Sequence, residues 1–285
     1  MTEPFTLLCP LLRTTSVIFS SPHSGRDYPA AFLAASALDR QEIRSSEDAF
    51  VDLLFASAPG MGAPLLAARA PRAYIDLNRA CDELDPGVID RVMTSAHNPR
   101  VSSGLGVVPR VVANGRVIHR GKISLAEAEA RIAAVWHPYH AALRKLIAQS
   151  LAAFGEAIVI DCHSMPHEAI EAHTRPGLAR PEVVLGDRFG AAAGREVVEH
   201  IAAAFADAGL RVGRNAPFSG AYIAQAYGRP SQQCHVVQIE IDRALYMNEA
   251  AVVPRPDFAA FQALMAGVVA EIAALGRRQM PLAAE

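Results

Sequence analysis

Two short strand-like runs, each followed by a His-Ser pair, limit the folds open to this chain. Residues 16–21 form the first run and His23 lies just beyond it, while residues 157–162 form the second and His163 follows directly. Short runs rich in Val and Ile are typical of strands buried on both faces of an α/β sheet. Ligands bind such sheets beyond the carboxyl ends of the strands. We therefore expect the two histidines to lie at one sheet edge, where their imidazoles can share a metal ion.

Strand-like and helix-like patterns alternate along the rest of the chain. Further strands are expected at 73–77, 182–185 and 235–241, and helices at 47–58, 124–154, 187–208 and 257–275. Ser124 begins one of these helices with a capping box, and Pro138 inside it predicts a kink near His137. The alternation, without internal repeats or a linker, predicts one α/β domain over residues 1–285 with a parallel or mixed sheet.

An Asn-Gly pair at residues 114–115 lies between two β-branched runs and predicts a type I′ hairpin over residues 111–118. In the register of that turn, Arg110 lies opposite His119, and Arg120 is on the other face of the hairpin. We expect the hairpin at the edge of the sheet or over the functional site.

The composition argues against several classes of function. The formal net charge is −2, and Lys and Arg do not cluster with aromatic residues, as they do in nucleic-acid-binding proteins. The four cysteines are scattered without a Cys-x-x-Cys pair, a pattern that fits a reducing compartment. We find neither a signal-peptide pattern nor an apolar run near the length of a membrane span. A soluble, cytoplasmic protein that binds neither nucleic acid nor membranes is therefore expected.

Two neighbouring acidic residues, Glu47 and Asp48, are candidates for a third metal ligand. Catalytic zinc sites commonly have three protein ligands, and two histidines with one carboxylate are one such set. Both acids are expected in the first turn of the helix at 47–58, where the helix dipole also favours acidic residues for structural reasons. The metal hypothesis requires only one of them to point back toward His23.

Glu240 is the candidate general base. It stands between Ile239 and Ile241 near the end of a predicted strand. A carboxylate is costly to bury there unless it is paired or functional, and burial raises its pKa toward the range of an acid-base catalyst. The structural alternative is an ion pair between Asp242 and Arg243, with Glu240 as an ordinary acid at the end of the strand.

Several arginines are candidates for binding an anionic substrate. Asn78 and Arg79 directly follow the strand expected at 73–77, so they are predicted to lie at the same sheet edge as the histidines. The planar guanidinium group matches the geometry of a carboxylate. Arg110 and Arg120 of the predicted hairpin are further candidates, although any one of these arginines alone is more often a surface or structural residue.

Five short blocks of this sequence resemble the N-formylglutamate amidohydrolase family, in the same order and from about residue 15 to about residue 250. The blocks are residues 21–25, Glu47-Asp48 with Asp52, residues 74–79, residues 161–164 and residues 220–222. The resemblance implies a three-layer α/β/α fold with a central mixed, largely parallel sheet, like that of the zinc carboxypeptidases.

The resemblance also implies the ligands of one Zn²⁺ ion. His23 and His163 correspond to metal-binding histidines. Arg26 stands where the zinc carboxypeptidases have the acidic ligand of a His-x-x-Glu motif. The acidic ligand is therefore expected further along the chain, with Asp48 preferred to Glu47.

The resemblance to the family also implies an activity, and the wider fold implies a catalytic residue. Glu240 resembles a catalytic glutamate at the end of a strand, and Asn78-Arg79 resembles a carboxylate-binding pair. The candidate substrate-binding residues are, together, Asn78, Arg79, Arg110, Arg120 and Tyr222. The expected reaction is metal-dependent hydrolysis of N-formyl-L-glutamate, a small N-acyl dicarboxylic amino acid, to formate and L-glutamate in histidine degradation. Two alternatives are a deacylase for another N-acyl acidic amino acid or small peptide, and a non-catalytic protein that binds acidic metabolites.

Overall fold

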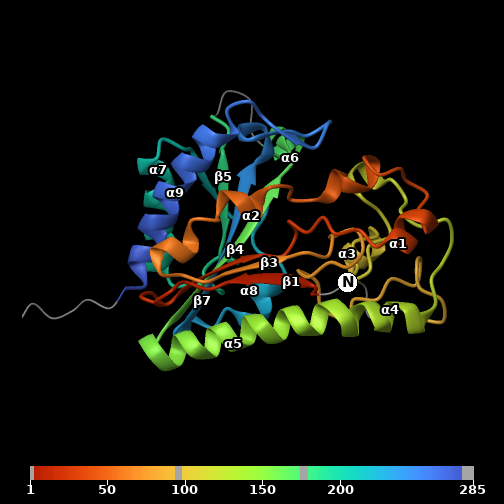
Figure 1. The fold of residues 1–285 in the computed structure, drawn as a ribbon, viewed down its shortest axis with the longest axis horizontal. Helices are drawn as coiled ribbons and strands as arrows, with labels where there is room; N and C mark the ends of the chain where they lie inside the picture. Colours follow the sequence, from red (N-terminus) through yellow and green to blue (C-terminus); the bar gives the residue numbers. More distant parts are fainter. Residues whose placement is uncertain (1–2, 94–97, 174–178, 278–285) are drawn as a thin grey trace, which may run out of the picture.

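The computed structural model describes residues 3–93, 98–173 and 179–277. Within these residues the chain forms a seven-stranded sheet with the strand order β1-β3-β2-β4-β7-β5-β6 (Figure 1). The strands are β1 Phe5–Leu8, β2 Val17–Ser21, β3 Leu65–Ala68, β4 Ala157–Met165, β5 Val183–Gly186, β6 Val212–Arg214 and β7 Cys234–Asp242. The four central strands β3, β2, β4 and β7 are parallel, whereas β1 is antiparallel to β3 and β5 is antiparallel to β7. The expected mixed, largely parallel sheet is thus confirmed.

Helices cover both faces of the sheet, so that the fold has three layers (Figure 1). On one face lie α2 (Val51–Leu54), α7 (Arg195–Asp207) and α9 (Phe258–Leu275), and on the other α4 (Leu125–Arg131), α5 (His137–Phe154) and α8 (Tyr222–Tyr227). Alternate residues of each strand face opposite layers: Val17 and Phe19 pack toward α7 and α9, and Ile18 between them packs toward α5. This alternation buries apolar side chains on both faces of the central strands.

Smaller elements complete the structure. They are α1 Ala30–Ala35, α3 Pro99–Ser102, α6 His167–His173, the short helical turns Glu42–Ser46, Ala58–Met61, Ala113–Gly115, Pro230–Gln232 and Arg243–Leu245, and the strands β8 Met247–Asn248 and β9 Val253–Pro254. Several of these lie in the loops beyond the carboxyl ends of the central strands, where they surround the site described below.

The long helix expected at 124–154 is present with the predicted interruption. Ser124 caps α4 by accepting a hydrogen bond from the backbone N–H of Glu127. A π-helical turn, Ile132–Trp136, then separates α4 from α5, in which Pro138 lies in the first turn. Proline has no N–H to donate and clashes with the preceding turn, so the helix rearranges just before it.

Two expected elements near the site are wrong. Of the helix expected at 47–58, only the four residues of α2 are α-helical. Phe50 adopts a left-handed conformation with φ 66°, so the helix cannot begin before Val51. The strand at 73–77 is a turn instead, in which Tyr74 and Ile75 both donate to the carbonyl of Pro71. The strand that pairs in the sheet is β3, whose sequence of Leu and Ala has little of the β-branched character on which strand recognition depends.

Two further expectations are corrected in part. The turn at 114–115 has the predicted positive φ angles, but the loop contains three residues and the strands form only an isolated bridge between Val111 and Val117. Arg110 therefore lies opposite Ile118 and not opposite His119. The helix expected at 187–208 begins later, at Arg195, and the residues before it form turns.

α9 is the exception to the expectation that no apolar run approaches the length of a membrane span. Its eighteen residues are long and apolar enough to cross a bilayer. In the folded chain, however, Met265, Val268 and Ile272 of this helix are buried in the core beside α7. This packing places one side of the helix in the core of the fold.

Candidate functional site

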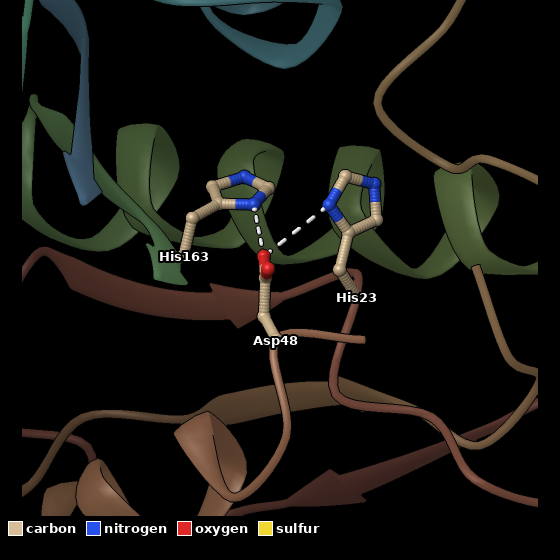
Figure 2. Close-up of side chains that lie close together, drawn as sticks. All are labelled: His23, Asp48 and His163. Atoms are coloured by element: carbon tan, nitrogen blue, oxygen red, sulfur yellow. Dashed lines mark hydrogen bonds and ion pairs between the residues drawn. The ribbon is translucent and has the colours of Figure 1, made fainter. Parts of the chain in front are cut away.

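His23, Asp48 and His163 form a buried cluster at the carboxyl edge of the sheet (Figure 2). His23 lies in the turn after β2, and His163 lies within the neighbouring parallel strand β4. One oxygen of Asp48, Oδ2, is 2.9 Å from Nδ1 of His163 and 3.4 Å from Nδ1 of His23. One potential ligand atom from each residue lies within 4.8 Å of the other two. The predicted pairing of the two histidines at one sheet edge is thus present in the structure.

Both imidazoles are oriented by groups on their far side. Nε2 of His23 lies 2.7 Å from Oδ1 of Asp76, and Nε2 of His163 lies 3.0 Å from Oδ1 of Asp161 and 3.0 Å from the amide nitrogen of Asn78. The Nδ1 atoms consequently point toward one another across Asp48 (Figure 2). Histidines that bind metals commonly have a carboxylate behind the ring in this way. Nδ1 of His23 is buried and has no hydrogen-bond partner in the described part of the chain.

Asp48 is held in place from two sides. Its second oxygen, Oδ1, accepts a hydrogen bond of 2.9 Å from Nη2 of Arg243, and its backbone N–H donates to the carbonyl of His23 at 3.0 Å. Burial alone would raise the pKa of Asp48, but the hydrogen bond with His163 and the nearby charge of His23 hold that pKa well below its ordinary value. Asp48 is therefore an ionised carboxylate with one oxygen directed at the two imidazoles.

Glu47, the alternative acidic ligand, points away from this cluster. Its carboxylate accepts hydrogen bonds from the guanidinium group of Arg44 and, at 2.7 Å, from the hydroxyl group of Tyr28. The structure thus brings Asp48 to the two histidines and leaves Glu47 in a structural network beside them.

Glu240 lies next to the cluster because β7 is adjacent to β4 and pairs His163 with Glu240 in register. Burial raises the pKa of Glu240 to about 7, opposed by the nearby charge of His163 and reinforced by that of Asp48. The amide of Gln238 donates to Oε1 of Glu240 at 2.7 Å and so fixes the carboxylate. A carboxyl group that titrates near neutrality suits proton transfer.

The alternative ion pair between Asp242 and Arg243 does not form. Asp242 caps the turn after β7 through the N–H of Ala244 and lies 2.8 Å from Nδ1 of His167. Arg243 points instead toward Asp48 and Ser164. Glu240 is therefore the strand carboxylate on the side of the histidine cluster.

These residues line a cavity of about 550 Å³. It also contains the side chains of four arginines, which are Arg72, Arg79, Arg100 and Arg243. Sequence reasoning identified Arg79 but did not assign the other three to the site. Arg72 lies in the same segment as Asp76, and its Nε donates to that carboxylate at 3.0 Å. Arg243 follows Glu240 by three residues. Both arginines are therefore close in sequence to the motifs, and this proximity could have identified them as site residues. No such signal exists for Arg100.

The expected substrate-binding residues divide between the cavity and other places. Arg79 lines the cavity. The amide nitrogen of Asn78 contacts His163 and Asp161, and its carbonyl oxygen accepts a 2.7 Å hydrogen bond from the N–H of Ile223. Asn78 therefore holds the metal-type cluster and the start of α8 together.

The remaining three candidates lie outside the residues that line this cavity. Arg110 forms an ion pair of 2.9 Å with Asp85, and Arg120 donates to the carbonyl of Ser36 at 3.1 Å. Tyr222 packs against aromatic rings of the α5 layer, with 5.8 Å between its ring centroid and that of Trp136.

Comparison with known proteins assigns the family. The model of the N-formylglutamate amidohydrolase family matches residues 15–247. The N-formylglutamate deformylase of Pseudomonas aeruginosa is 30% identical to this chain over 238 residues, which cover 82% of this chain and 83% of the relative. The N-formylglutamate deformylase of Pseudomonas putida is 27% identical over 238 residues, which cover 82% of this chain and 82% of the relative. The crystal structure of N-formylglutamate amidohydrolase from Ralstonia eutropha JMP134 superimposes with a TM-score of 0.89 at 33% identity, covering 96% of this chain and 98% of that one. A gene product of Agrobacterium tumefaciens shares the fold at 18% identity, with a TM-score of 0.64 and coverage of 96% and 94%. The chain belongs to the N-formylglutamate amidohydrolase family.

Proposed function

We propose that this chain is a metal-dependent amidohydrolase that cleaves N-formyl-L-glutamate to formate and L-glutamate in the cytoplasm, as a step of histidine degradation. The observation that carries the proposal is the buried His23–Asp48–His163 cluster beside Glu240 in a cavity rich in arginine. The family and its deformylase relatives support the choice of a formamide as the bond that is cleaved.

The donor set of the cluster fits a catalytic zinc ion. Two imidazole nitrogens and one carboxylate oxygen are ligands that zinc accepts, and three protein ligands leave a position for water or substrate. The buried Nδ1 of His23, which no described residue satisfies, is the kind of atom that a metal would bind. Zn²⁺ bound by His23, Asp48 and His163 would lower the pKa of a bound water and polarise a carbonyl group.

The residues of the chain supply proton transfer and binding. Glu240 takes a proton from the attacking water and returns it to the departing amine of glutamate, which its pKa near neutrality permits. Gln238 keeps the carboxylate directed during both transfers. Arg72 and Arg79 provide positive charge for the carboxylates of the substrate.

The cavity volume favours one alternative, a deacylase for a larger N-acyl group or a small peptide. A cavity of about 550 Å³ falls in the range that accommodates drug-sized ligands, which are larger than N-formylglutamate. A non-catalytic binding protein on the same fold is the other alternative, and a buried glutamate with a pKa of about 7 beside the cluster argues against it.

The proposal is tested with the purified protein. Elemental analysis should find about one zinc per chain, and a panel of N-acyl amino acids should give formate release with N-formyl-L-glutamate as the best substrate. His23→Ala and His163→Ala should lose most of the zinc and the activity while the circular dichroism spectrum is retained. His167→Ala, at a half-exposed histidine outside the cavity, is the control. Unchanged zinc content in both cluster variants would refute the site, and preference for a longer acyl group would select the deacylase alternative.

A further inference from the structure

The charges of the cavity are unevenly balanced. Asp48 is paired with Arg243 at 2.9 Å, and Asp76 is paired with Arg72 at 3.0 Å. The remaining arginines of the cavity are less closely paired: Arg79 has Glu83 at 3.9 Å, and Arg100 has no ion pair among the described residues.

The guanidinium group of Arg79 is buried, but not all of its nitrogen atoms have a hydrogen-bond partner among the described residues. Its Nε donates to the carbonyl of Leu105 and its Nη1 to the carbonyl of Asn78, both at 2.9 Å. The nearest carboxylate, that of Glu83, is 3.9 Å from Nε, beyond hydrogen-bond range. These bonds orient the side chain and leave Nη2 without a partner among the described residues.

Arg100 brings a second positive charge to the same part of the cavity. It lies in the first turn of α3, which Asn98 caps by accepting hydrogen bonds from the N–H groups of Arg100 and Val101. The side chain of Arg100 is exposed, and no residue in the described ranges accepts a hydrogen bond from its guanidinium group. Arg79 and Arg100 line the same cavity, and burial together with the neighbouring charges of Arg72 and Arg100 lowers the pKa of Arg79.

The position of the pair relative to the reacting centre determines which carboxylate it can bind. Arg72 is bonded to Asp76, which contacts Nε2 of His23. Arg243 is bonded to Asp48. These two cations therefore lie beside the groups that carry out the chemistry. Arg79 instead donates to main-chain carbonyls and Arg100 lies on α3, so among the described residues neither arginine is bonded to a carboxylate of the cluster. The α-carboxylate of an N-acyl amino acid is close to the scissile amide, whereas the carboxylate of its side chain is further away.

We propose that Arg79 and Arg100 together bind the side-chain carboxylate of the substrate, and that Arg100 determines the preference for acidic over neutral N-acyl amino acids. The inference rests on the proposed function, because it concerns the same cavity. Two guanidinium groups can each give a charge-assisted hydrogen bond to one carboxylate, and the anion removes the repulsion between them. Arg79 is the fixed member of the pair, and Arg100 is the member that approaches from the rim.

The decisive comparison is between N-formyl-L-glutamate and N-formyl-L-glutamine, which have nearly the same size but differ in charge. Arg100→Met should reduce kcat/KM for the glutamate derivative by about 10- to 100-fold, mainly through KM, because it removes a charge-assisted hydrogen bond. It should leave kcat/KM for the glutamine derivative unchanged. Arg100→Lys, which retains the charge but not the planar fork, should retain part of the discrimination. Arg195→Met, at an arginine of α7 that is 86% exposed and outside the cavity, is the matched control.

A binding measurement separates this inference from the proposed function. Glutarate carries two carboxylates and no bond to hydrolyse, so its affinity can be measured by calorimetry whether or not the protein is a deformylase. The wild-type protein should bind glutarate, and Arg100→Met should lose about 10-fold or more in affinity. If the wild type cleaves neither formyl compound but shows this loss, the proposed function fails and the carboxylate site stands. If Arg100→Met keeps both the wild-type discrimination ratio and the wild-type affinity for glutarate, the inference is wrong.

Discussion

At the scale of single residues, the direction of each side chain decides its role. Glu47 and Asp48 are adjacent, and Glu47 has an extended backbone with φ −64° and ψ 142°. Successive side chains of an extended segment point in opposite directions, so only one of the two acids can face the histidines. The same principle separates Glu240, which faces the cavity, from its neighbours Ile239 and Ile241, which face the core.

Alanine substitutions at the two adjacent acids should therefore have different effects. Asp48→Ala should weaken zinc binding strongly, because it removes a ligand and leaves Arg243 without its buried partner. Glu47→Ala should affect zinc binding less and instead lower the free energy of unfolding by about 1–3 kcal/mol, because Tyr28 and Arg44 lose their acceptor. A chelator-competition titration and urea unfolding measure the two quantities. The reverse order of zinc affinities would show that Glu47 is the ligand.

Glu240→Gln should separate proton transfer from binding. The amide keeps the size of the side chain but cannot accept a proton at neutral pH, so kcat should fall by about 10²- to 10⁴-fold while zinc remains bound. Asp242→Asn, on the same strand but outside the cavity, is the matched control and should keep most of the activity. A kcat for Glu240→Gln close to that of the wild type would exclude the proposed role.

At the scale of secondary-structure elements, the sequence predicted strands and helices with strong apolar patterns and missed those without them. β2, β4, β7 and α9 were recognisable because their residues form continuous apolar runs or helical repeats. β3 was missed, and residues 73–77 were assigned to a strand although they form a turn, because local composition does not show which segment pairs with β2. Asn78 follows this turn and lines the cavity, with its amide nitrogen in contact with His163, and its role in binding substrate stays a prediction.

Within α5, a buried histidine should make the stability of the protein depend on pH. His140 is fully buried, with Nδ1 2.8 Å from the hydroxyl group of Tyr227 and Nε2 2.9 Å from the carbonyl of Leu77. Burial lowers its pKa from 6.5 to about 4, so the folded protein keeps this imidazole neutral in a range where the unfolded chain binds a proton.

The sign of the effect follows from the lowered pKa. The contribution of His140 is intact above pH 6.5 and is lost progressively as the pH falls to about 4, with a total on the order of 3 kcal/mol. Urea unfolding across this range should therefore show a steeper loss of stability for the wild type than for His140→Gln. His200→Gln, on α7, is the control for a general effect of replacing a histidine with glutamine. Equal slopes for the wild type and His140→Gln would contradict the prediction.

At the scale of the whole molecule, we propose that residues 1–285 form a single domain. β1 begins at Phe5 and β7 ends at Asp242, yet both belong to one sheet. The last helix is tied to the start of the chain, because Thr15 donates to the carbonyl of Ala273 at 2.7 Å and the N–H of Ser16 donates to that of Gly276 at 2.9 Å. The seven-stranded sheet and the two largest hydrophobic clusters each contain residues from both halves of the chain.

Unfolding should accordingly occur in one cooperative transition. Trp136 is the only tryptophan of the chain and is buried in the layer of α5, so its fluorescence reports on one side of the sheet. Far-ultraviolet circular dichroism reports on all helices and strands. The two signals should give coincident urea transitions. A tryptophan transition that clearly precedes the other would indicate two separately folding parts.

The register of β4 and β7 also bears on how proteins with this sheet can diverge. His163 and Glu240 are partners across two parallel strands, so the spacing between them is set by main-chain hydrogen bonds. An insertion of one residue in either strand would turn one of these side chains into the layer of α7 and α9. Pro109, residues 111–115 and residues 217–221 line the cavity from loops, where changes in length do not disturb that register. New substrate preferences on this fold should therefore arise in the loops, while the lengths of the two strands stay fixed.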